Sequence, residues 1–302
     1  MLTTSKSYHY LRNSICFLLL VFCLNSFGQS DLLIQAQTLC NEKKYTDAIP
    51  IIEKIIVHAD TKEDATSWYI RSYAYLQVYK QGGKTNFSKI NLLDTVVTSA
   101  VKSQLLDKDK LYANENKELI KSAASNFYKA CTILLQDSLN SEKSEVYYSN
   151  YKKTTAIYDS NFDFKAKDIE YYNAMGGIFE DIYMKSNFNQ KHGDVAKYAL
   201  LKVLELDSKN IRANINLGVL YYNQGATLMR MMDYDVDLAQ LDVIQENAKK
   251  LFKQSLPFMI KVYELDPQKE QALESLQGIY SALLDDEKAN EFKQKKEALN
   301  KK

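Results

Sequence analysis

Residues 212–225 read RANINLGVLYYNQG, and residues 262–267 read VYELDP. In the first stretch Gly218 lies three residues before Tyr221, and Gly225 follows four residues later. A small residue spaced in this way among large ones predicts a helix that a neighbouring helix approaches closely. The second stretch ends in Leu-Asp-Pro, and a proline shortly after the last apolar residue of a helix is typical of a helix end. The two stretches together predict a pair of packed helices.

Similar spacings recur on both sides of this pair. The residues that correspond to Gly218 in five copies are Ala36, Ser72, Gly176, Gly218 and Gln277. The second helices of the pairs are expected around Ala48, Ile52 and Ile55, around Ala196, Leu200 and Val203, around Ser255, Met259 and Val262, and around Ala289. For the helix around Trp68, the matching second helix is displaced to Ala123, Phe127 and Ala130. The copies are separated by 36, 104, 42 and 59 residues, so insertions interrupt the repeat.

This pattern resembles the tetratricopeptide repeat, a helix–turn–helix of about 34 residues with W-x₂-L-G-x₂-Y in its first helix. The resemblance covers most of residues 31–295 and implies an all-α fold, in which helix pairs stack into a right-handed α-α superhelix. The layout is similar to a group of exported bacterial tetratricopeptide proteins. The low number of turn formers, three prolines and nine glycines in 302 residues, also favours long helices.

The insertions carry structural predictions of their own. One spans about residues 81–115, where Gly82-Gly83 should end the Trp68 helix and residues 91–106 are expected to be helical. The other spans about residues 226–250 and predicts an extended helical hairpin with its tip near residues 233–235. Pro257 should kink the second hairpin helix or mark a new start, whereas Pro50 lies near a helix start. We expect a short helix with irregular flanks in residues 137–165.

The N-terminus has the layout of a secretory signal peptide. Lys6 and Arg12 precede an apolar run of ten residues, and Ser26 and Gly28 supply small residues before a cleavage site at Gln29. The expected organisation is therefore a signal peptide at 1–28, a repeat domain at 29–295 and a polar tail at 296–302. Lipidation at Cys23 and a retained membrane anchor are the alternatives. The expected location is the periplasm or the outer membrane, with no transmembrane span in the mature chain.

Charge argues against a nucleic-acid partner. Removal of residues 1–28 takes away two cations and no acid, so 37 basic and 38 acidic residues remain, a net charge of −1. A nucleic-acid-binding protein needs a basic face for the phosphates. Cys40 and Cys131 remain in the mature chain and could form a disulfide in an oxidising compartment, or be two buried small residues.

Motifs that carry chemistry are incomplete throughout the sequence. Gly82-Gly83-Lys84-Thr85 lacks the first glycine of a phosphate-binding loop and follows a helix, so we interpret it as a helix stop. Asp233, Asp235 and Asp237 have the spacing of a calcium loop, but Leu238 and Ile244 stand where that loop needs Gly and Glu. His58 and His192 stand alone, without the spacing of a zinc site. We therefore expect a protein that is not an enzyme and has no cofactor or metal. An enzyme with a dispersed site is a third hypothesis.

A binding surface is implied by the resemblance. In tetratricopeptide arrays the first helices line a concave face, and the matching positions here are Tyr69, Tyr73, Asn173, Glu180, Arg212, Tyr222 and Asn223. Tyrosine and arginine suit a binding surface because they combine contact area with a polar group. The tyrosines fit equally well as packing residues between repeats.

The sequence therefore predicts a non-enzymatic interaction scaffold of the cell envelope, which binds a protein or peptide partner in its concave groove. The alternative is an outer-membrane accessory protein for a small molecule or glycan, with Trp68 and the tyrosines as an aromatic platform. Neither the identity of the partner nor the oligomeric state follows from the sequence.

Overall fold

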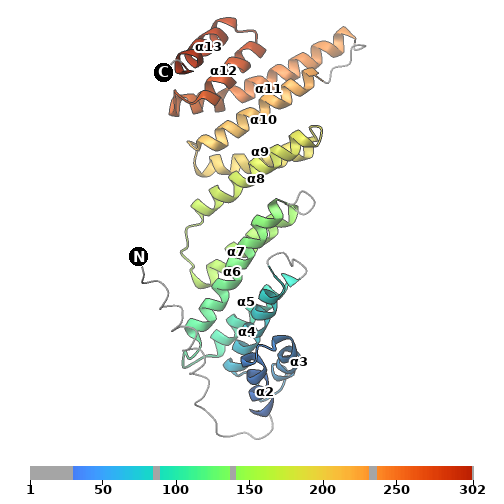
Figure 1. Ribbon diagram of the computed structural model, residues 1–302, viewed down its shortest axis with the longest axis vertical. Helices are drawn as coiled ribbons and strands as arrows, with labels where there is room; N and C mark the ends of the chain where they lie inside the picture. The colour runs from blue at the N-terminus through green and yellow to red at the C-terminus, as the bar shows by residue number, and fades with distance from the viewer. Residues whose placement is uncertain (1–29, 84–88, 137–140, 231–236, 301–302) are drawn as a thin grey trace. The chain divides into compact units, whose positions relative to one another are not determined.

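The computed structural model describes residues 30–83, 89–136, 141–230 and 237–300 (Figure 1). Within these ranges every regular element is a helix and no strand occurs, which confirms the all-α prediction. The predicted signal peptide and the hairpin tip at 233–235 lie outside the described residues. None of the described helices combines the length and the apolar composition that crossing a membrane requires.

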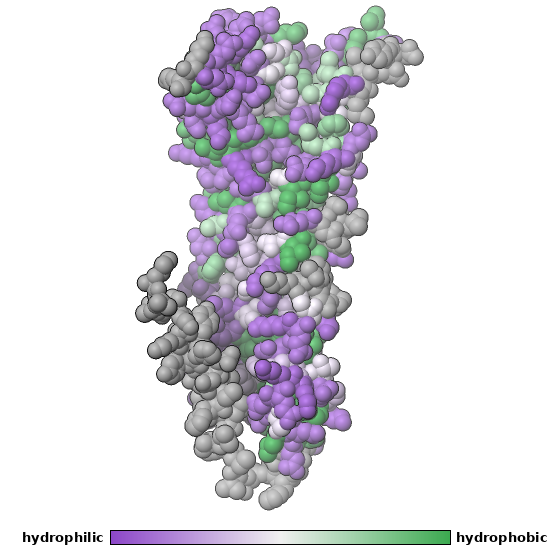
Figure 2. Space-filling model, viewed as in Figure 1, coloured by the Kyte–Doolittle hydropathy of each residue, from purple (hydrophilic) through white to green (hydrophobic). Residues whose placement is uncertain are grey.

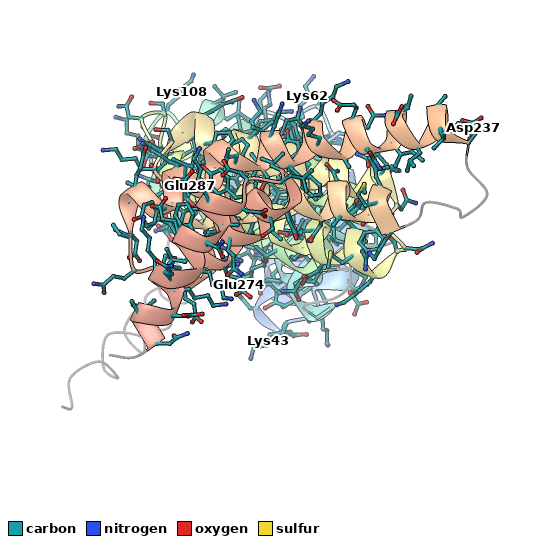
Figure 3. The ribbon with its side chains drawn as sticks, turned by 90° about the horizontal axis from the view of Figure 1, so that it is seen from above. Lys43, Lys62, Lys108, Asp237, Glu274 and Glu287 are labelled. Carbon is teal, nitrogen blue, oxygen red and sulfur yellow. The ribbon has the colours of Figure 1, made fainter. Side chains whose placement is uncertain are left out.

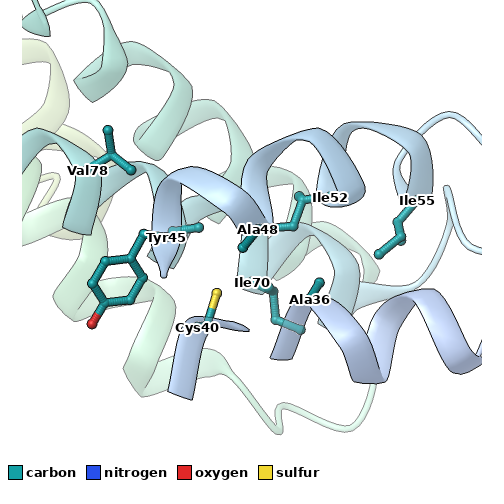
Figure 4. Close-up of a cluster of buried hydrophobic side chains, with 9 residues drawn as sticks. Ala36, Cys40, Tyr45, Ala48, Ile52, Ile55, Ile70 and Val78 are labelled. Atoms are coloured by element: carbon teal, nitrogen blue, oxygen red, sulfur yellow. The ribbon is translucent and has the colours of Figure 1, made fainter. Parts of the chain in front are cut away.

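The chain divides into two compact units, Met1–Asn126 and Phe127–Lys302. The first holds α2 (Ser30–Asn41), α3 (Tyr45–Ile55), α4 (Ala65–Gln81), α5 (Leu92–Leu106) and the first half of α6 (Ala113–Leu135). α3 packs on α2 and on α4, and α2 also touches α4. Ala36, Ala48 and Ala74 are completely buried, one from each of these helices, and such small side chains permit the close approach. Figure 4 shows Ala36 and Ala48 within this cluster of buried side chains.

α4 begins after an N-cap residue and ends where the sequence predicts. The Asp64 side chain accepts hydrogen bonds from the backbone N–H groups of Thr66 and Ser67, which otherwise have no partner in the first turn. The helix ends at Gln81, and Gly83 adopts a φ of 79°, a conformation that favours glycine. The helix stop at Gly82-Gly83 is therefore confirmed.

The partner of α4 differs from the prediction. The sequence pattern pairs the Trp68 helix with Ala123, Phe127 and Ala130 of α6, whereas α5 packs along α4 in the structure. The α4–α5 contact is partly polar: the Ser72 hydroxyl donates to the Val96 carbonyl at 2.8 Å, and the Ser103 hydroxyl donates to the Ala65 carbonyl at 2.9 Å. A sequence search for large apolar residues overlooks such a contact. Here buried serines, which donate hydrogen bonds to the backbone of the neighbouring helix, take the place of apolar side chains.

The second unit continues with seven helices among its described residues. These are α7 (Ser141–Tyr158), α8 (Lys165–Lys185), α9 (Gln190–Leu206), α10 (Ile211–Arg230), α11 (Leu238–Leu265), α12 (Glu270–Ala282) and α13 (Asp286–Asn300). α8 packs on α9, α9 on α10, α10 on α11, α11 on α12 and α12 on α13, while α8 touches α10 and α10 touches α12. The first helices of successive pairs are thus neighbours, as in a repeat of helix pairs. Hydrophilic residues cover α12 and α13 on the face drawn in Figure 2.

Glycines allow the helices of each pair in this unit to approach closely. A Cβ atom on Gly176 would lie 2.6 Å from Leu200 of α9, and one on Gly218 would lie 2.8 Å from Met259 of α11. Both distances are shorter than van der Waals contact, so a larger residue at either position would force the Leu200 or Met259 side chain to move. The Ser255 hydroxyl donates to the Gly218 carbonyl at 2.6 Å across the same contact. The small and large positions that the sequence aligned in these copies do face each other.

The hairpin of α10 and α11 confirms the prediction of two lengthened helices. α11 has 28 residues, and Figure 3 shows its first residues, marked by Asp237, projecting away from α12 and α13. The helix runs through Pro257, so this proline does not mark a new helix start. Pro50 also lies inside a helix, at the sixth residue of α3, one turn further in than the start.

α7 is longer than the short helix expected in residues 137–165. It runs for 18 residues and buries Tyr148, Tyr151 and Thr155 at helical spacing. The rings of Tyr148 and Tyr171 of α8 stack with centroids 4.0 Å apart, and the Tyr148 hydroxyl donates to Asp168 at 2.8 Å. A tyrosine-rich segment suggests a polar, irregular region. Here the tyrosine rings form the core, and their hydroxyl groups remain hydrogen-bonded.

Candidate functional site

Four of the predicted binding residues lie where α8 and α10 run side by side. We define the α8–α10 face by Asn173, Gly177, Glu180 and Met184 of α8 together with Arg212, Asn216 and Asn223 of α10. The four α8 residues are three or four positions apart and so share one side of the helix. A Cβ atom on Gly177 would lie 3.5 Å from Arg212 Nη2 and 3.6 Å from Asn216 Nδ2, and Asn223 Nδ2 lies 3.4 Å from Met184 Sδ. The face therefore combines both helices.

Arg212 and Asn216 supply hydrogen-bond donors on this face. Arg212 is exposed in the first turn of α10, and no hydrogen bond or ion pair joins its guanidinium to any residue that the structure describes. The Asn216 amide lies beside it and likewise has no hydrogen bond to the described residues. Gly177 brings the backbone of α8 near both groups, and a Cβ atom there would make only ordinary contact with them. An arginine beside an amide suits acceptors such as carboxylate and carbonyl oxygens.

Glu180 is the half-buried acid of the α8–α10 face. Burial raises the pKa of Glu180 to about 7, and the neighbouring charge of Asp181 adds to the rise. No cation or hydrogen-bond donor among the described residues compensates its carboxylate. A perturbed, uncompensated carboxyl group is typical of a position where a ligand supplies the missing partner, although structural sites also contain such groups.

Asn173 anchors the start of α10. Its Nδ2 donates to Asn210 Oδ1 at 3.4 Å, and the same oxygen accepts from the backbone N–H of Ala213 at 3.1 Å. Asn173 Oδ1 is buried without a hydrogen-bond partner among the described residues. Its role is to position α10 beside α8, since the side chain itself is almost completely covered.

The other three predicted residues are packing residues in large part. Tyr222 of α10 lies against Phe252 of α11, with ring centroids 5.4 Å apart, and a Cβ atom on Gly278 of α12 would lie 3.4 Å from its hydroxyl oxygen. Tyr69 of the first unit stacks on Tyr112 at 4.7 Å, and burial raises its pKa to about 12.

Tyr73 packs against Tyr45, with ring centroids 6.0 Å apart, and burial raises its pKa as well. Trp68 is half-buried, and its indole N–H donates to the Lys62 carbonyl at 2.7 Å. The Arg71 guanidinium lies 5.8 Å from the centroid of the Trp68 ring system. The predicted aromatic platform is thus engaged in contacts within the protein.

Sequence reasoning missed Gly177 and Asn216. Each lies four residues after a predicted site residue, Asn173 and Arg212 respectively, so helical spacing alone could have indicated them. It also missed a cleft between α7, α8 and α9, because the side chains that line it are up to 53 residues apart in the sequence.

Neither of the described cysteines has the surroundings of a reactive thiol. Cys40 and Cys131 are both buried and unpaired, and burial raises their pKa values to about 11 and about 12. A thiol with a raised pKa stays protonated and is a poor nucleophile. The described part of the chain contains no group of three or more His, Cys, Asp or Glu side chains that could hold a metal ion.

Comparisons with known proteins leave the family open: no protein-family model and no curated protein sequence matches this chain.

Proposed function

We propose that this protein is a non-enzymatic interaction scaffold, which binds an extended segment of a protein or peptide partner on the α8–α10 face. The observation that carries the proposal is the pair of unengaged donor groups, Arg212 and Asn216, which lie together beside Gly177. These donors would bind carboxylate or backbone carbonyl oxygens of the partner. A donor group of the same partner would compensate the half-buried Glu180 carboxyl.

We further infer that the chain is a tetratricopeptide-like repeat protein whose helix pairs form a right-handed superhelix. The neighbouring first helices and the Gly176–Leu200 and Gly218–Met259 contacts support this inference, since they follow the small–large pattern of that repeat. Stacking of successive first helices would continue the α8–α10 face towards α12.

Crosslinking and affinity capture with the tagged protein in its own cells test the binding face. The wild-type chain should recover one or more specific partners. Arg212→Ala and Asn216→Ala should each lower the recovery several-fold, because each removes donors without touching the core. Lys253→Ala is the matched control, since it removes an exposed cation from α11 and leaves the α8–α10 face intact. Equal recovery by all four proteins would contradict the proposed face.

Export to the cell envelope is part of the same proposal and has a separate test. It rests on the signal-peptide layout of residues 1–28. Cell fractionation followed by mass spectrometry of the intact protein should find a chain that begins at Gln29 in the periplasm or at the outer membrane. An uncleaved chain in the cytoplasm would refute export and leave the binding face untested by this experiment.

A further inference from the structure

The second unit contains a cleft that the proposed function does not use. It has a volume of about 550 Å³ and lies between α7, α8 and α9. Its lining residues are Glu145, Met175, Phe179, Gln190, Lys191, Asp194, Val195 and Tyr198. Met175 and Phe179 point to a different side of α8 from Gly177 and Glu180, so the cleft and the α8–α10 face are separate. A cleft of this size can hold a small organic molecule.

The cleft has an apolar interior and an acidic rim. Met175, Phe179 and Val195 line it together with the ring of Tyr198, which is 42% exposed. Glu145 and Asp194 contribute two carboxylates and Lys191 contributes one cation, so the formal charge of the lining is −1. Charge complementarity favours a cationic ligand, and the apolar interior favours a ligand with an apolar body.

The two carboxylates are each held by one hydrogen bond. Glu145 Oε1 accepts from the Tyr198 hydroxyl at 3.1 Å, and Asp194 Oδ1 accepts from Gln190 Nε2 at 2.9 Å. The second oxygen of each carboxylate makes no hydrogen bond to the described residues. These two oxygens can therefore accept hydrogen bonds from a ligand. The Tyr198–Glu145 bond also joins α9 to α7 at one side of the cleft.

We propose that the cleft between α7, α8 and α9 binds a small organic cation, in which a primary ammonium group is attached to an apolar body. The ammonium group bonds to the open oxygens of Glu145 and Asp194. The apolar body covers Val195 and the Tyr198 ring and displaces water from them. This inference is independent of the partner-binding face.

Methyl NMR with the whole protein tests the site directly, because the Met175 and Val195 methyl groups report from inside the cleft. 2-Phenylethylamine is the probe, and 2-phenylethanol and phenylacetate are its neutral and anionic counterparts. A ligand of this size should bind with a dissociation constant on the order of 1 mM. We expect the amine to shift both methyl signals, the alcohol to bind at least threefold more weakly, and phenylacetate to leave the signals unchanged.

Charge-removing variants that preserve shape complete the test. Asp194→Asn and Glu145→Gln should each weaken amine binding at least threefold, and Glu145→Gln can still accept the Tyr198 hydrogen bond. Asp242→Asn is the control, since it removes an exposed carboxylate on α11 outside the cleft. Circular dichroism establishes that each variant is folded.

Three results would overturn the proposal. The first is phenylacetate or the alcohol binding as tightly as the amine. The second is unchanged amine binding in both cleft variants. The third is a lysine-containing peptide that shifts the same methyl signals at a tenfold lower concentration than the amine, which would identify a peptide groove instead.

Discussion

At the residue scale, the Glu180 carboxyl should make stability depend on pH. Its pKa in the folded protein is about 7, against 4.5 for an ordinary glutamate, so the folded state binds the proton more tightly than the unfolded state. Its contribution to the free energy of unfolding is therefore greatest below pH 4.5 and is lost as the pH rises through 7. Glu180→Gln should stabilise the protein by on the order of 2 kcal/mol at pH 8 and have little effect at pH 4.

Urea denaturation of both proteins at the two pH values measures this difference. Asp181→Asn provides a directional check, because the charge of Asp181 contributes to the raised pKa of Glu180. That variant should shift the pH dependence of the Glu180 contribution to lower pH. If the difference in the free energy of unfolding between wild type and Glu180→Gln stays constant from pH 4 to pH 8, the pKa of Glu180 is not raised.

Two glycines of the second unit should respond to alanine in opposite directions. A Cβ atom on Gly225 would lie 2.8 Å from Phe252 Cε1 and 3.1 Å from the Ala248 carbonyl oxygen, and the backbone oxygen cannot move aside freely. Gly225→Ala should therefore destabilise the protein by about 1–3 kcal/mol. At Gly177 the nearest atoms are at 3.5 Å, an ordinary contact distance, so Gly177→Ala should stabilise α8 by about 0.5–1 kcal/mol. Thermal unfolding of both variants measures the two changes, and a loss of stability in both would contradict the distinction.

At the element scale, the sequence predicts helices that meet through large apolar residues better than helices that meet through polar ones. The α10–α11 pair could be predicted because Gly218 and Tyr221 in one helix, and Ser255 and Met259 in the other, each stand at helical spacing. The α4–α5 pair could not, because Ser72 and Ser103 bury themselves by bonding to backbone carbonyls. The donors Arg212 and Asn216 could be placed on a helix from the sequence. Their position beside Gly177 could not, because Gly177 belongs to another helix.

The prolines of the α10–α11 hairpin and of the turn after it offer a matched comparison. Pro257 lies inside α11 and removes one backbone hydrogen bond of the helix. Pro257→Ala restores that donor and should stabilise the protein by about 1–2 kcal/mol, since the gain in helix propensity exceeds the entropy that the unfolded chain regains. Pro267 lies in the turn between α11 and α12, where the helical hydrogen bond is not needed. Pro267→Ala should therefore lower stability by up to about 1 kcal/mol. Equal effects of the two substitutions in urea denaturation would mean that Pro257 has a compensating role in α11.

At the scale of the whole molecule, stability should be local. All helix pairs in substantial contact within the described residues are at most two places apart in chain order. In such a fold each helix depends on its neighbours, and the free energy of unfolding is approximately a sum of helix-pair terms and interfaces between them. A cavity in one core cluster should therefore weaken its own surroundings most strongly.

Ile52 of α3 and Met259 of α11 are suitable probes, since at most 1% of either residue's surface is exposed. Truncation of either side chain to alanine removes about 2–5 kcal/mol of local stability. Hydrogen exchange followed by mass spectrometry should show faster exchange in α2, α3 and α4 for Ile52→Ala, and in α10, α11 and α12 for Met259→Ala. Each variant serves as the control for the other. If either substitution accelerates exchange equally along all described helices, the two units unfold as one cooperative body, and the chain is an ordinary globular domain in its energetics despite its neighbour-to-neighbour contacts.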